Sequence, residues 1–280
     1  MTDERRIITA PRSVMGVVRH GSRLYTDNAG ALWKILVPLA VIAQLLDVAL
    51  TVAVVPAGSV VVNGTIYVPP GSSVSSVALA GALTIIVEAL IGIVTFGAAV
   101  RLLATTALGR PETPGDAFTY AFRRTGPLVW LSIMYTLLVA GGGALFIIPG
   151  VYVAVALVAA IPVLLIEDLR GGVAIKRSSQ LTKGRWWATL GALIPAGLVV
   201  GGIAIALSLA LRVSGSIAAY ALAQAASGLI IEVFLTPIWI ATTVAIYVDL
   251  RARNDPERNT APFTVDPSVP PPAAAGNPWV

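Results

Sequence analysis

All but one of the 19 lysine and arginine residues lie on the same side of six long apolar runs. The cations gather before or at the start of run one, between runs two and three with Arg101 at the end of run two, between runs four and five, and after run six. The other gaps hold only Arg212. Positively charged flanks stay in the cytoplasm during membrane insertion. The pattern predicts six membrane spans with both termini cytoplasmic. The runs cover residues 31–55, 77–103, 127–147, 151–166, 186–211 and 216–248.

The composition also indicates a membrane protein. The chain is 56% hydrophobic and only 12% charged, with a mean hydropathy of +0.85, whereas a soluble domain carries about 25% charged residues. We assign the net charge of +5 to orientation and to contact with anionic lipid headgroups, not to nucleic acid. Arginine outnumbers lysine strongly, which is typical of GC-rich bacterial genomes. We therefore expect a multi-pass protein of a bacterial plasma membrane.

Three segments are predicted along the chain. Residues 1–12 form a polar N-terminus, residues 13–253 form the membrane domain, and residues 254–280 form a proline-rich tail that we expect to be disordered and cytoplasmic. The first apolar run begins too late for a cleavable signal peptide, so we expect the N-terminus to be retained.

The membrane domain reads as three repeated units. Each unit begins with a short amphipathic helix, predicted at residues 13–27, 113–122 and 172–182, and continues with two spans. Such helices are expected to lie flat on the cytoplasmic surface. The predicted fold is an all-α integral membrane protein with six transmembrane helices in three helical hairpins.

Turn signals mark three further features. Two β-rich arms surround Asn63-Gly64, the strongest short signal for a β-hairpin, so a small external hairpin is predicted. Pro149-Gly150 predicts a tight external turn between runs three and four. Pro162 and Pro237 are expected to bend runs four and six.

Several stretches together resemble a known family. They are Ile-Pro-Gly at residues 148–150, the apolar segment with its glutamate at 162–167, the basic stretch ending in Trp-Trp at 174–187, and residues 247–253 after a proline-containing last span. They look like the membrane domain attached to some glycerophosphoryl diester phosphodiesterases, which also occurs alone in YciC-like six-span bacterial proteins. In that family the phosphodiesterase activity belongs to a separate soluble barrel that needs histidines and glutamates. This chain has one histidine, His20, so the resemblance implies the membrane fold and no established activity.

Acidic residues within the apolar runs are the first candidate site. Asp47, Glu88 and Glu232 lie inside predicted spans, where a carboxylate is costly and marks a functional site by default. Two interpretations remain open. The glutamates either hold helices together through neutral hydrogen bonds, with Thr84, Gln224, Ser227 or Thr236 as partners, or line a path for a proton or cation.

Cations at the predicted inner face are the second candidate site. They are Arg177, Lys183, Arg185, Arg251 and Arg253. They either contact anionic lipid or an acidic partner, or serve only as orientation signals. If Glu167 and Asp249 pair with them, this region is a structural clasp.

Enzyme signatures are absent from the sequence. There is no phosphate-binding loop, nucleophile elbow or metal-binding histidine pair, and the lack of cysteine excludes thiolate chemistry. We expect no enzyme activity, no cofactor and no bound metal. The first functional hypothesis is a scaffold or accessory subunit that contacts the bilayer and other membrane or cytoplasmic proteins. The alternative is a transporter or lipid-handling protein that uses its mid-membrane carboxylates.

Overall fold

The computed structural model describes residues 12–71, 74–211 and 214–254. Six helical segments are long and apolar enough to cross a membrane, as predicted. Two of these segments join several elements: Ile147–Glu167 contains α6 and α7, and Ile217–Asn254 contains α10, η1 and α11. Arg212 and the tail from residue 255 onward lie outside the described residues. The elements are α2 (Val14–Val54), β1 (Val60–Val62), β2 (Thr65–Tyr67), α3 (Val74–Ala107), α4 (Pro114–Arg123), α5 (Thr125–Leu145), α6 (Ile147–Ala156), α7 (Ala160–Glu167), α8 (Gly171–Thr182), α9 (Trp186–Ala210), α10 (Ile217–Ile230), the π-helix η1 (Ile231–Leu235) and α11 (Thr236–Asn254).

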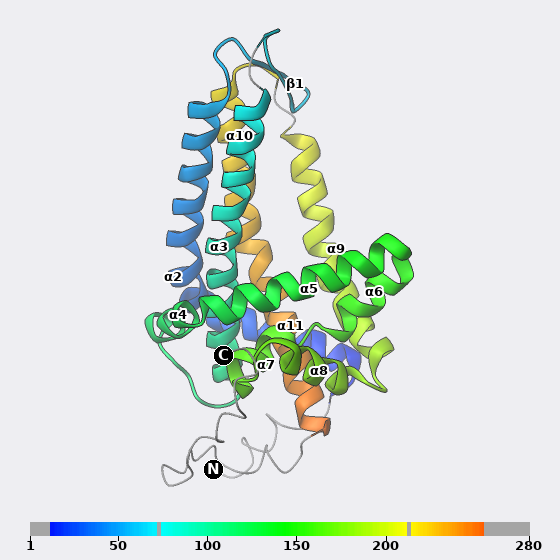
Figure 1. Cartoon of the computed structure of the whole chain (residues 1–280). Coiled ribbons are helices and arrows are strands. Elements are labelled where there is room, and N and C mark those ends of the chain that lie inside the picture. Colours follow the sequence, from blue (N-terminus) through cyan, green and yellow to red (C-terminus); the bar gives the residue numbers. More distant parts are fainter. Residues whose placement is uncertain (1–11, 72–73, 212–213, 255–280) are drawn as a thin grey trace, which may run out of the picture.

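Helix α2 is continuous where a break was predicted after residue 27. Ser13 caps it by accepting a hydrogen bond from the Gly16 amide at 3.1 Å. The side chain of Asn28 donates back to the Leu24 carbonyl at 3.0 Å, so this polar residue is satisfied inside the helix and does not end it. In Figure 1 the start of α2 crosses the base of the molecule before the helix rises beside α3.

The two-stranded sheet confirms the predicted hairpin. Strands β1 and β2 are antiparallel, with Val62 opposite Thr65. Asn63 and Gly64 have φ angles of 52° and 79°, the positive values that a tight hairpin turn demands. Val61 and Gly215 exchange two backbone hydrogen bonds, which ties the hairpin to the segment before α10. We call this end of the molecule the hairpin end and the opposite end, with α4, α7 and α8, the base (Figure 1).

Helices α5 and α6 form a hairpin that crosses the direction of the other long helices. Figure 1 shows α5 running across α3 and α9, with the α5–α6 turn far from β1. The chain turns at Phe146, so the turn predicted at Pro149-Gly150 is wrong by three residues. Proline is accommodated in the first turn of a helix. Gly150 instead permits close packing, since an added Cβ there would lie 2.9 Å from Gly143 Cα.

The two predicted proline bends correspond to interruptions of the helical pattern. Run four is divided into α6 and α7 at residues 157–159, three residues before Pro162. Run six contains the π-helix immediately before Pro237, and Thr236 donates its hydroxyl proton to the Ile231 carbonyl at 3.2 Å. A proline frees a carbonyl in the preceding turn, and a π-turn accommodates the changed register.

The hydrophobic core lies toward the base. Helix α11 is buried over most of its length, and Tyr247 is fully buried. Leu32 and Leu36 of α2, Leu103 of α3 and Leu164 of α7 belong to the same cluster. The two short helices predicted at residues 113–122 and 172–182 are present as α4 and α8. Their buried positions include small residues, such as Ala117 and Ala174.

Candidate functional site: a carboxylate cavity and a buried ion-pair cluster

The three acids of the predicted spans converge on one region between α2, α3 and α10. Asp47 and Glu88 both line a cavity of about 480 Å³, and Glu232 follows Ile231, which lines it too. All three side chains are half-buried. Glu88 is within electrostatic range of both Asp47 and Glu232. Carboxylates from distant parts of the sequence therefore form one electrostatically coupled group.

Polar side chains complete the wall of this carboxylate cavity. Gln44 is only 8% exposed, lines the cavity, and makes no hydrogen bond to any residue that the structure describes. It packs directly against Gly228 of α10, where any side chain would collide with its carboxamide. The carboxamide atoms are not sealed from the cavity, so a molecule in the cavity can reach them. The cavity therefore presents a polar group that a bound water, proton carrier or cation would satisfy.

The other polar side chains bond locally. Asp47 lies near the side chain of Thr51, four residues further along α2. Gln224 donates to the Tyr220 hydroxyl at 3.0 Å, and Ser227 donates to the Gln224 carbonyl at 2.7 Å. Among the described residues, neither Glu88 nor Glu232 makes a hydrogen bond to the partners that were predicted for neutral helix-to-helix bonding. Those partners were Thr84, Gln224, Ser227 and Thr236.

The carboxylate cavity reaches from the hairpin end to the middle of the bundle. Ile66 of β2 and Val55, just after α2, line one end, and Gln44 lies eleven residues before Val55. At 1.5 Å of rise per residue this separation is about 16 Å, roughly half of a 30 Å hydrocarbon layer. Toward the base, Leu36 and Ile240 belong to tightly packed core. In the described structure the cavity is thus a half-depth recess.

At the base, predicted acids and cations form a buried cluster. Glu167, whose side chain is 5% exposed, pairs with Arg177 at 3.0 Å. Tyr247 donates its hydroxyl proton to Glu167 at 3.1 Å, and Arg251 donates to the Tyr247 oxygen at 3.3 Å. This series of polar contacts connects α7, α8 and α11. The pairing of Glu167 with one of the candidate cations, on which a structural clasp depended, is present.

Asp249 of α11 holds together a second group of polar contacts. It pairs with Arg253 at 2.8 Å and accepts a hydrogen bond from the Arg12 amide at 2.6 Å. Arg253 also donates to the Arg12 carbonyl. The predicted clasp therefore holds the start of the described chain against its end.

The five predicted inner-face cations consequently fall into two groups. Arg177, Arg251 and Arg253 take part in the internal contacts just described. Lys183 and Arg185 lie between α8 and α9 and form no ion pair with any residue in the described part of the chain. Of the five, these two are the residues most available to lipid or a partner.

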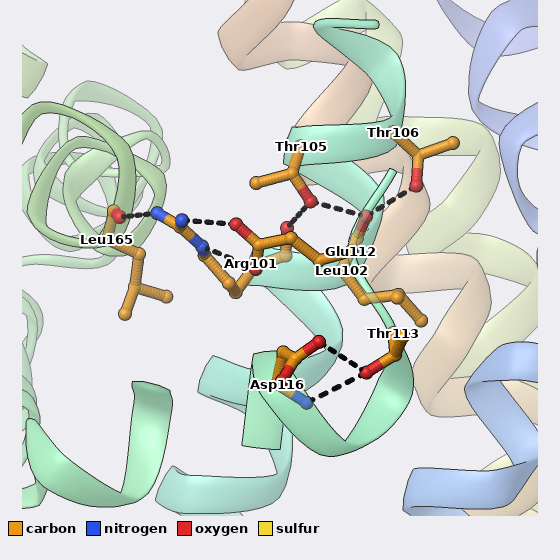
Figure 2. A network of polar contacts seen from close by, with 8 residues as sticks. All are labelled: Arg101, Leu102, Thr105, Thr106, Glu112, Thr113, Asp116 and Leu165. Atoms are coloured by element: carbon orange, nitrogen blue, oxygen red, sulfur yellow. Dashed lines mark hydrogen bonds and ion pairs between the residues drawn. The ribbon is translucent and has the colours of Figure 1, made fainter. Parts of the chain in front are cut away.

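A third polar cluster was not singled out from the sequence (Figure 2). Arg101 of α3 binds Glu112 through two nitrogens, with Nε at 3.0 Å, and donates to the Leu165 carbonyl at 2.8 Å. Its guanidinium also stacks over the Tyr120 ring at 4.0 Å. Arg101 had been counted as a span flank. The sequence did contain a signal for the Arg101–Glu112 contact. Glu112 and the helix-capping Thr113 follow Arg101 closely, and the turn there returns the chain toward α3.

Within the described residues, no group of three or more histidine, cysteine or acidic side chains is arranged to hold a metal. Comparisons with protein-family models, curated proteins and solved structures find no match to this chain. The functional argument therefore depends on the geometry of the two polar regions.

Proposed function

We propose that this protein is a non-enzymatic multi-pass protein of a bacterial plasma membrane that moves protons across the bilayer. Its carboxylate cavity is the outer half of the path, and the packed core must open to complete it. The observation that supports this proposal is the convergence of Asp47, Glu88 and Glu232, from three helices, beside the unpartnered carboxamide of Gln44. Acidic residues in apolar helices are costly and mark proton relays and ion pathways.

Protons suit this arrangement better than a tightly held metal. The carboxylates do not form a compact ligand set within the described residues. They are instead distributed along the depth of the bundle, with Asp47 nearest the hairpin end.

The direction of uptake follows from the charge pattern. The cationic gaps flank α4 and α8 at the base, so the positive-inside rule orients the base toward the cytoplasm and the hairpin end outward. In this orientation both termini are cytoplasmic. The carboxylate cavity then begins at the outer face, and the packed core closes its inner end.

A scaffold or accessory-subunit role is the second candidate. The base supports it, because the Glu167 and Asp249 clusters hold α2, α7, α8 and α11 in one arrangement, while Lys183 and Arg185 remain available to an acidic partner or lipid headgroup. The membrane-domain family suggested by the sequence stays a prediction and is compatible with either role.

The decisive experiment measures proton flux in vesicles that contain the purified protein and an enclosed pH-sensitive dye. Wild-type protein is expected to acidify the vesicle interior under an imposed gradient. Glu88→Gln and Glu232→Gln should each abolish the flux, because glutamine keeps the shape of the side chain and its hydrogen-bonding groups but cannot titrate in this range.

Asp27→Asn is the matched control. Asp27 is an exposed carboxylate on α2 near the base, outside the carboxylate cavity, and its replacement should leave the flux unchanged. Wild-type vesicles that show no flux above protein-free vesicles, or glutamine variants with full flux, would contradict proton uptake and favour the scaffold role.

A further inference from the structure

A second large cavity lies between the α5–α6 hairpin and the helices that it crosses. Its volume is about 460 Å³, within the range of small-molecule sites. Leu131 of α5 and Val155 of α6 line one side, Leu193 of α9 lines another, and Trp239 of α11 contributes an aromatic wall. We call it the hairpin cavity after the α5–α6 hairpin, which is distinct from the β-hairpin that defines the hairpin end. It is separate from the carboxylate cavity, with which it shares no lining residue.

The hairpin that covers this cavity has a strongly apolar tip. Phe146, Ile147 and Ile148 are 75%, 81% and 82% exposed. Such a surface is unfavourable in water and favourable in hydrocarbon. The tip therefore lies among lipid acyl chains, and the hairpin cavity opens into a lipid environment.

One wall of the hairpin cavity is not purely apolar. Ser132, Tyr135 and Thr136 of α5 line it at helical spacing, so their hydroxyls share one face. None of the three side chains forms a hydrogen bond with a described residue. Thr243, the fourth hydroxyl in the lining, donates to the Trp239 carbonyl at 2.9 Å. Unpaired hydroxyls in hydrocarbon are costly, so the α5 wall suits a chain that carries an acceptor oxygen.

Interface-type residues lie where α6 and α9 meet, next to the lining residues Val151 and Leu190. Trp186 stacks on Tyr152 with ring centroids 5.5 Å apart and donates to the Tyr152 carbonyl at 3.1 Å. Lys183 and Arg185 shortly precede Trp186 in the sequence. Asp249 lines a small crevice with Arg185 and is paired with Arg253. Tryptophan and tyrosine beside cations are typical of the headgroup level of a membrane.

We infer that the hairpin cavity binds one acyl chain of an anionic phospholipid from the leaflet at the base. The chain occupies the apolar space under the hairpin. An ester carbonyl of the lipid accepts a hydrogen bond from the α5 hydroxyls, and the anionic headgroup lies against Lys183 and Arg185. This site does not depend on proton uptake at the carboxylate cavity.

The test uses phosphatidylglycerol with a photoreactive diazirine at the end of one acyl chain. The full-length protein is reconstituted in phosphatidylcholine vesicles that contain a trace of this probe, illuminated, digested and mapped by mass spectrometry. Labelling is expected to concentrate on the α5 and α9 peptides that line the hairpin cavity. Labelling spread evenly over all lipid-facing helices would overturn the inference, because it would reveal only ordinary bilayer contact.

A cavity-filling variant tests occupancy directly. Gly197 lines the hairpin cavity, and a Cβ there would meet only Trp239, at an ordinary 3.9 Å. Gly197→Leu should fold normally and lower the labelling about tenfold, equivalent to ~1.4 kcal/mol. Gly202→Leu, on the same helix but exposed and without neighbours within 4 Å, is the control and should label as wild type does. Equal labelling of the two variants, each with wild-type thermal stability, would refute a chain inside the cavity.

Two further variants separate the parts of the ligand. Tyr135→Phe should weaken labelling by phosphatidylglycerol and by a phosphatidylcholine probe alike, because both carry esters. Lys183→Gln combined with Arg185→Gln should remove the preference for the anionic probe only. Equal labelling of wild-type protein by the two probes would overturn the assignment to an anionic lipid.

Discussion

Replacement of Glu167 by glutamine should destabilise the base severely. The Glu167 side chain is 5% exposed, pairs with Arg177 at 3.0 Å and accepts the Tyr247 hydroxyl proton at 3.1 Å. Glutamine retains an acceptor for Tyr247 but removes the carboxylate charge that pairs with Arg177. Removal of one partner from a buried ion pair costs 3–5 kcal/mol, and because Arg177 remains 19% exposed we expect the lower end, ~3 kcal/mol.

The measurement is denaturant-induced unfolding of the purified protein in mild detergent, followed by tryptophan fluorescence. Arg170→Gln is a matched control from the same region, because Arg170 and Asp168 form an exposed pair at 3.8 Å with side chains 63% and 56% exposed. Exposed pairs contribute ~1 kcal/mol or less. If the two variants lose similar stability, burial does not determine the strength of these ion pairs and the reasoning is refuted.

Two other predictions concern the membrane arrangement. The wild-type chain has no cysteine, so Gly64→Cys at the hairpin turn should react with an impermeant maleimide in intact cells, whereas Gly172→Cys, exposed at the base, and Phe146→Cys at the α5–α6 tip should not. Labelling of Gly172→Cys from outside would reverse the orientation, and labelling of Phe146→Cys would place the tip at the outer surface. Phe118 stacks on Phe122 with centroids 6.0 Å apart, so Phe118→Asp should lower expression and melting temperature by introducing a charge at the α4 interface. Unchanged values would contradict a membrane contact of α4.

Local chemistry was sufficient to predict the helical elements and the β-hairpin. A long apolar run is a helix in hydrocarbon because only intrahelical bonds satisfy its backbone, and six such helices are present. Asn63-Gly64 turns the chain because both residues tolerate positive φ. The continuity of α2 was not predictable from residue types, since Asn28 breaks or continues a helix according to what its side chain binds.

Charge pairing was partly visible in the sequence. The sequence marked Glu167 and Asp249 as acids close to cations, and both form ion pairs, because a buried carboxylate at the base must be neutralised. Which arginines would be used was decided by packing. Arg177 and Arg253 turn inward, while Lys183 and Arg185 remain without ion pairs among the described residues.

The sequence by itself determined the apolar helices, the hairpin turn and the presence of costly acids within the spans, because each depends on residues close together in the chain. Only the tertiary structure brought Asp47 and Glu88 to one cavity and placed Glu232 next to its lining residue Ile231, since helix rotation and packing decide which faces meet. It also decided the course of α5 and α6 across the bundle (Figure 1). A hairpin that crosses the membrane and one that returns within it carry the same cationic flanks, so their charge pattern is identical. Only packing, here against α3, α8 and α9, distinguishes them.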